Sequence, residues 1–160
     1  MQHCKYIHLS RCSDKEVRIN DRDRTFVFGE KKNMDYRKIY EKWAESPHLE
    51  ESEKNVLAEM SEEEMSDAFY RKLSFGTAGM RGVMGLGTNR LNKYTIRMAA
   101  KGFAGILGEG ARVAIAYDTR NHSDEFAKEA ARVLADSGVK ALLFDRYSPV
   151  PLLSFTVRDL

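Results

Sequence analysis

Apolar residues recur with helical spacing between residues 36 and 72, and this pattern predicts three short helices. The first is ended by Ser46-Pro47, because the residue before a proline disfavours helical backbone. The second covers residues 52–60. The third begins after Ser61, which forms a capping box with Glu64 in the first turn of the helix. The apolar positions of the first and third helices are Tyr36, Ile39, Tyr40, Trp43, Met65, Ala68 and Phe69.

Beyond residue 92, helical patterns alternate with short β-rich runs. Strand, helix and strand at this spacing form a βαβ unit, so the two strands are predicted to be parallel with a right-handed crossover. Asn92 and Ser123 are the predicted N-caps, and Gly138 is the predicted C′ residue. The expected elements are a helix over 93–107, a strand over 112–117, a helix after 123, a strand over 139–144 and a final helix starting between Pro149 and Pro151.

Residues 1–33 carry no helical stripe and only a short alternating piece over 25–28. A metal site could be drawn from His3, Cys4, His8 and Cys12, but their spacing matches no usual zinc pattern, which favours a solvated tail. Residues 29–33 require purine-rich codons, placed like a ribosome-binding site before Met34. We therefore expect residues 1–33 to be a disordered tail or an over-extended start, with translation beginning at Met34.

Composition narrows the function classes. The chain has 160 residues, of which 42% are hydrophobic and 31% are charged, as in one globular domain. A net charge of +2 argues against nucleic acid or an anionic membrane as partner. No apolar run approaches the roughly 20 residues of a membrane span, and no signal peptide is visible. Two cysteines need no disulfide framework, so the expected location is the cytoplasm.

Candidate chemistry is concentrated in the segment from residue 73 to residue 90, which holds five glycines and two arginines. Glycine lets backbone N–H groups approach a ligand, and arginine presents a planar set of donors to phosphate oxygens. The segment is therefore predicted to be an anion-binding loop. It lacks the Gly-Lys-Ser/Thr triplet of a P-loop and the G-x-G-x-x-G dinucleotide fingerprint.

Individual residues leave alternatives open. Arg81 is the best candidate for phosphate contact, although it could equally be a surface arginine paired with a carboxylate. Arg120 lies two residues after Asp118, past a predicted strand end where ligands collect in parallel sheets. It could bind substrate or brace the turn with Asp118. His122 is interpreted as an exposed histidine before a helix rather than an acid or base. Arg90, Asn92 and Arg97 are expected to position the loop.

Several motifs in order resemble the α-D-phosphohexomutases, the phosphoglucomutase/phosphomannomutase family. The similarity runs from about residue 35 to residue 160 and is strongest to the bacterial phosphoglucomutase and phosphopentomutase branch. Val150 stands where the family often has threonine. The matching motifs are Phe75-Gly-Thr-Ala-Gly-Met-Arg-Gly82, Gly87-Thr-Asn-Arg-Leu-Asn92, Ala116-Tyr-Asp-Thr-Arg-Asn-His-Ser123 and Pro149-Val-Pro-Leu-Leu-Ser-Phe-Thr-Val-Arg158.

The resemblance implies a fold and an activity. The fold would be a three-layer α/β/α domain with a mixed, mainly parallel sheet, incomplete at its C-terminus, over 73–160, preceded by a helical segment over 34–72. The activity would be an isomerase reaction that interconverts sugar 1-phosphates with 5- or 6-phosphates through a phosphoserine, with Mg²⁺ and a sugar bisphosphate activator. Arg81 would hold the transferring phosphoryl group, with donors from Thr77, Ala78 and Gly79.

The family's active-serine motif, Thr-Ala-Ser-His-Asn-Pro, does not occur in these residues. We therefore expect a first domain that ends before the serine, has no mutase activity alone, contains no metal site and is poorly soluble. Its expected partners are a phosphosugar and the remaining domains of the enzyme. Two alternatives remain: a non-catalytic phosphate- or nucleotide-binding module, and an interaction protein that docks a partner through its acidic helical region.

Overall fold

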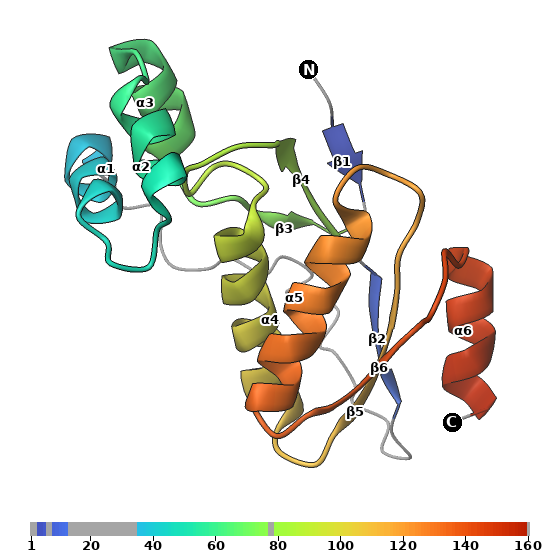
Figure 1. Cartoon of the computed structure of the whole chain (residues 1–160). Helices are drawn as coiled ribbons and strands as arrows, with labels where there is room; N and C mark the ends of the chain where they lie inside the picture. Colours follow the sequence, from blue (N-terminus) through green and yellow to red (C-terminus); the bar gives the residue numbers. More distant parts are fainter. Residues whose placement is uncertain (1–2, 6–7, 13–34, 77–78, 160) are drawn as a thin grey trace.

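The computed structural model describes residues 3–5, 8–12, 35–76 and 79–159 (Figure 1). Its main sheet has the strand order β2-β5-β6, and a smaller sheet has the order β1-β4-β3. Strands β5 and β6 are parallel, whereas β2 runs antiparallel to β5, so the main sheet is mixed, as predicted. The strands are β1 (His3–Lys5), β2 (His8–Cys12), β3 (Phe75–Gly76), β4 (Gly79–Val83), β5 (Arg112–Ala116) and β6 (Lys140–Leu143). The helices are α1 (Tyr36–Ala44), α2 (Glu51–Ala58), α3 (Glu62–Phe69), α4 (Lys93–Leu107), α5 (Ser123–Asp136) and α6 (Val150–Asp159).

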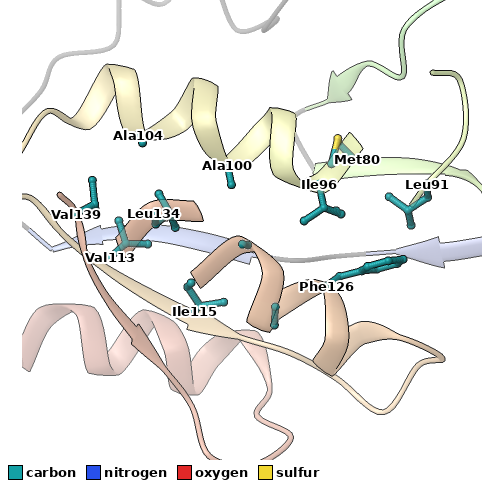
Figure 2. Packing of buried hydrophobic residues seen from close by; sticks show 12 residues of the cluster. Met80, Leu91, Ile96, Ala100, Ala104, Val113, Ile115, Phe126, Leu134 and Val139 are labelled. Atoms are coloured by element: carbon teal, nitrogen blue, oxygen red, sulfur yellow. The ribbon is translucent and has the colours of Figure 1, made fainter. Parts of the chain in front are cut away.

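Strand β5 is the centre of the three layers. Its side chains alternate between the two faces of the sheet, and the central ones are fully buried. Val113 and Ile115 pack with α4 and α5 in the larger core cluster (Figure 2). Ala114 and Ala116 pack on the other face against Leu153 of α6. The α/β/α arrangement predicted for this part of the chain is therefore confirmed.

The helical segment from residue 36 to residue 72 also forms as predicted, because its signals are local. Ser61 caps α3, and its backbone N–H donates back to Glu64 Oε2 at 2.9 Å. Phe69, which is fully buried, contacts Trp43 of α1 edge-on at 5.5 Å between ring centroids. Trp43 in turn contacts Tyr94 of α4 at 5.4 Å. This aromatic chain joins the helical segment to the α/β domain.

Two short strands lie within the first 33 residues, where the sequence predicted no regular element at these positions. Strand β1 pairs antiparallel with β4, from His3 opposite Val83 to Lys5 opposite Arg81. Strand β2 pairs antiparallel with the whole of β5. The alternating piece over 25–28, the codon argument over 29–33 and the Met34 start lie outside the described residues.

The predicted cap of α5 is wrong. The N-cap residue is His122, which adopts left-handed backbone with φ of 59°, and Ser123 is the first residue of the helix. The Ser123 hydroxyl accepts a hydrogen bond from the backbone N–H of Asp118 at 3.2 Å and is buried. It stabilises the preceding loop rather than its own helix. Gly138, with φ of +76°, follows the helix end as predicted.

Candidate functional site

Arg81 lies on strand β4 rather than in an irregular loop, which corrects the prediction for the glycine-rich segment. Phe75 pairs with Met80 and Gly76 with Gly79, so β3 and β4 form an antiparallel hairpin. Successive side chains of a strand point to opposite faces. Met80 enters the core cluster (Figure 2). The next residue, Arg81, is consequently exposed. Met80 therefore anchors the hairpin in the core, while its neighbour Arg81 remains accessible to solvent.

The remaining loop candidates are only partly described. Gly79 opens β4, opposite Gly76. Thr77 and Ala78, the predicted donors to a phosphate, lie outside the described residues.

The loop after β5 is braced by Asp118. Its carboxylate accepts from the backbone N–H of Arg120 at 3.1 Å and lies 3.4 Å from Arg120 Nε. This is the bracing arrangement that the sequence left open beside substrate contact. The Arg120 side chain remains 42% exposed, so it can still meet a ligand from the solvent side. We therefore retain Arg120 as a secondary candidate.

His122 is held by its own helix. Its Nδ1 lies 2.8 Å from Glu125 Oε2, and its ring is tilted against Phe126 at 6.2 Å. Among the described residues other than glycine, it alone has positive φ. The short interaction with Glu125 and the left-handed backbone explain this residue structurally. The sequence did not reveal this conformation, because only the tertiary course of the loop requires it.

A pocket of about 370 Å³ lies where the helical segment meets the α/β domain. Gly85, two residues beyond β4, and His122, at the start of α5, both line it. The end of β4 and the loop after β5 therefore meet at one place, as a shared site requires; Figure 1 shows them at the same end of the domain. Arg81 is not among the lining residues. The apolar lining consists of Val56, Met84, Leu86, Leu91 and Phe126, which suits apolar groups better than a phosphate.

An ionic network beside the pocket fastens α4 to α2. Lys93 Nζ lies 2.7 Å from Glu50 Oε1 and 3.0 Å from Glu53 Oε1, and the Tyr94 hydroxyl donates to Glu53 Oε2 at 2.6 Å. The hydrogen bond with Glu50 raises the pKa of Lys93 far above its usual value, against the effect of burial. Burial alone would raise the pKa of Glu53, but the bonds from Tyr94, the Glu50 backbone and Lys93 lower it overall. The network therefore favours a positively charged Lys93 and a negatively charged Glu53 at neutral pH.

Of the three residues predicted to position the loop, Arg90 and Asn92 make contacts that hold the segment, whereas the ion pair of Arg97 joins two helices instead. Arg90 forms an ion pair with Asp67, and Arg97 Nε lies 2.6 Å from Glu129 Oε2, joining α4 to α5. Asn92 caps α4 by accepting from Tyr94 and Thr95, and its amide group donates to the carbonyls of Gly85 and Gly87. Sequence spacing could reveal the cap but not these partners, which lie across other elements.

Within the described ranges, no cluster of three or more histidine, cysteine, aspartate or glutamate side chains is arranged to hold a metal ion. The side chains in these ranges therefore do not fit a Mg²⁺ site. None of the helices described is long and apolar enough to cross a membrane.

The fold and these residues define an α/β/α domain that carries an exposed arginine on a glycine-rich hairpin. The family described as "Phosphoglucomutase/phosphomannomutase, alpha/beta/alpha domain I" matches residues 72–160. The chain belongs to this family.

Relatives in the genus Staphylococcus carry the same similarity. Proteins named phosphoglucomutase from S. saprophyticus and S. aureus are each 44% identical to this chain over 110 residues. The corresponding protein of S. epidermidis is 45% identical over 110 residues. Each match covers 67% of this chain but only 20% of the relative, so the chain spans about a fifth of the relatives it matches. No solved structure matches the chain.

Proposed function

We propose that this chain forms the first domain, and with it one side of the active-site cleft, of a phosphosugar mutase. Such an enzyme is an isomerase of carbohydrate metabolism that interconverts hexose or pentose 1-phosphates and 6- or 5-phosphates. The observation that carries the proposal is the family match, which includes the hairpin that exposes Arg81. Its partners would be a phosphosugar and the rest of the same enzyme. The cytoplasm is the proposed location.

Arg81 is the proposed phosphoryl contact. A guanidinium offers five donors in a fixed plane, which suits a phosphoryl group whose charge is spread over three oxygens. Because β4 is held by β3 and by Met80 in the core, the arginine would need little reorganisation to meet that charge. Backbone or hydroxyl donors would come from Thr77, Ala78 and Gly79.

The nucleophile would come from elsewhere. The family's serine motif does not occur in the 160 residues. Since the chain spans only about a fifth of the relatives it matches, we propose that the phosphoserine and its Mg²⁺ belong to other parts of the enzyme. Mg²⁺ would supply charge neutralisation between the phosphoserine and the substrate. We accordingly propose that this polypeptide positions a phosphate but does not transfer one.

A phosphate titration followed by NMR tests the proposed contact. Inorganic phosphate, and then glucose 1,6-bisphosphate, should shift the amide signals of residues 79–82 and the Nε–H signal of Arg81. The variant Arg81→Gln should lose these shifts, whereas Arg132→Gln, on the exposed face of α5, should retain them. Equal responses of the two variants would contradict the contact.

A coupled assay with glucose 1-phosphate tests the second part of the proposal. The 160-residue chain should show no turnover above the rate without protein. Measurable formation of glucose 6-phosphate by this chain would show that it transfers phosphate by itself.

A further inference from the structure

The turn from residue 84 to residue 92 connects β4 to α4, and several of its hydrogen bonds reach the end of α3. The backbone N–H of Asn89 donates to the carbonyl of Ala68 at 2.8 Å, and its side-chain amide donates to the carbonyl of Asp67 at 2.9 Å. Arg90 Nη2 lies 2.6 Å from Asp67 Oδ2. The turn thus donates hydrogen bonds to backbone carbonyls that have no partner within the last turn of a helix.

The segment just after α3 completes this attachment. Arg71 Nε donates to Asn89 Oδ1 at 3.0 Å, and the Thr88 hydroxyl donates to the carbonyl of Arg71 at 2.8 Å. The backbone N–H of Leu73 donates to the carbonyl of Thr88 at 2.7 Å. Thr88 and Asn89 are each only 7% exposed, so these bonds are shielded from water.

The same turn folds back on β4. The backbone N–H of Leu91 donates to the carbonyl of Val83 at 2.9 Å, and that of Gly85 donates to the carbonyl of Leu91 at 3.3 Å. On the other side, a Cβ on Gly82 would lie 2.8 Å from Leu73 Cδ1, so β4 packs directly on the chain leaving α3. Val83 is two residues from Arg81. A continuous set of contacts therefore connects the end of α3 to the strand that carries the arginine.

We propose that Asp67 and Asn89 are positioning residues for Arg81. The end of α3 holds the 84–92 turn in place, and this turn holds β4 in its position and orientation. The helical segment is then part of the phosphate site, although it supplies no group to the phosphate. The expected effect on phosphate binding rests on the proposed function, but the ordering of β4 can be measured without any ligand.

Amide hydrogen exchange and phosphate titration on the 160-residue chain test the inference together. We compare Asp67→Ala and Asn89→Ala with Glu63→Ala, an exposed residue of the same helix. Both variants should speed exchange at Gly82, Val83 and Leu91 at least tenfold, and should weaken inorganic phosphate binding at Arg81 about threefold or more. Exchange in β5 should stay unchanged, which separates lost positioning from general unfolding. Asp67→Glu should retain much of the exchange protection of β4 and much of the affinity for inorganic phosphate.

The inference is overturned if exchange in β4 changes no more in these variants than in Glu63→Ala, or if β5 exchange rises equally. Should Asn89→Ala fail to fold, Asp67→Ala decides, because its side chain is 61% exposed and its loss leaves no cavity. If the unaltered chain does not bind phosphate, the proposed function fails, while the exchange comparison still decides whether α3 orders β4.

Discussion

Tyr94 donates its hydroxyl proton to Glu53 at 2.6 Å, so a residue of α4 is hydrogen-bonded to a carboxylate of α2. Lys93, the neighbour of Tyr94, binds the same carboxylate at 3.0 Å. The Glu53 side chain is 19% exposed. One largely buried carboxylate therefore contributes two of the contacts that attach the helical segment to the domain.

The first prediction concerns acid pH. Because the folded-state pKa of Glu53 is lowered from its ordinary value of 4.5, its contribution to stability is present above that value and is lost as pH falls through the folded pKa. Glu53→Gln should lower the free energy of unfolding at pH 7 by about 2 kcal/mol and flatten its dependence on pH below 4.5. Urea unfolding between pH 3 and pH 7 measures both.

The matched control is Glu51→Gln on the same helix, whose side chain is 82% exposed and pairs only with Lys54. It should change stability by less than about 0.5 kcal/mol. An identical pH profile for the Glu53 variant and the unaltered chain would contradict the role assigned to this carboxylate.

The second prediction separates two functions of Asn92. Its carbonyl oxygen caps α4, and its amide group donates to Gly85 and Gly87 in the turn. Asn92→Ala removes both and should cost about 3 kcal/mol. Asn92→Asp keeps the cap but sets a carboxylate against carbonyl oxygens, so it should remain destabilised. Thermal melts monitored by circular dichroism check this; an aspartate variant as stable as the asparagine chain would show that the cap alone matters.

The third prediction compares two glycines. Gly87 has φ of +123°, and a Cβ there would lie 2.6 Å from the carbonyl oxygen of Ala68. Gly105, within α4, has open space around its Cβ position. Gly87→Ala should therefore destabilise the chain by about 3 kcal/mol. Gly105→Ala should stabilise it by about 0.5 kcal/mol, because alanine favours helix. Chemical unfolding measures the free energy of unfolding of both variants. Equal changes in the two would refute the close approach of Gly87 to the carbonyl of Ala68.

The fourth prediction concerns the N-terminal strands. Since β2 pairs along the whole of β5, a chain that starts at Met34 should leave that edge of the sheet open. It should melt at a lower temperature than the 160-residue chain and associate more at high concentration, as sedimentation would show. Equal melting temperatures would mean that β2 adds nothing to the fold. The intact mass of natively expressed protein tests the Met34 start separately.

The elements predicted correctly are those whose signals are local. The capping box of Ser61 and Glu64, the Asn92 cap and Gly138 each act within one turn of backbone, so their spacing in the sequence is sufficient. The parallel pairing of β5 and β6 followed because a helix of that length joins them.

What the sequence did not reveal depends on distant partners. Ser123 bonds to Asp118 instead of capping α5, because His122 turns the backbone left-handed. Arg81 is on a strand because residue 80 enters a core built from later elements. The contributions of Glu53 and Asp67 to the pocket and the turn arise from α2 and α3, whose charged faces resemble an ordinary solvated surface.

The pairing of β2 with β5 also bears on the order of folding during synthesis. His8 leaves the ribosome early, but its partner Ala116 follows more than a hundred residues later. Closing so long a loop costs entropy, whereas the β5–α5–β6 unit closes a short one. We expect this unit to form first and the N-terminal strand to dock last. In that interval the open edge of β5 is where a nascent chain would need a chaperone.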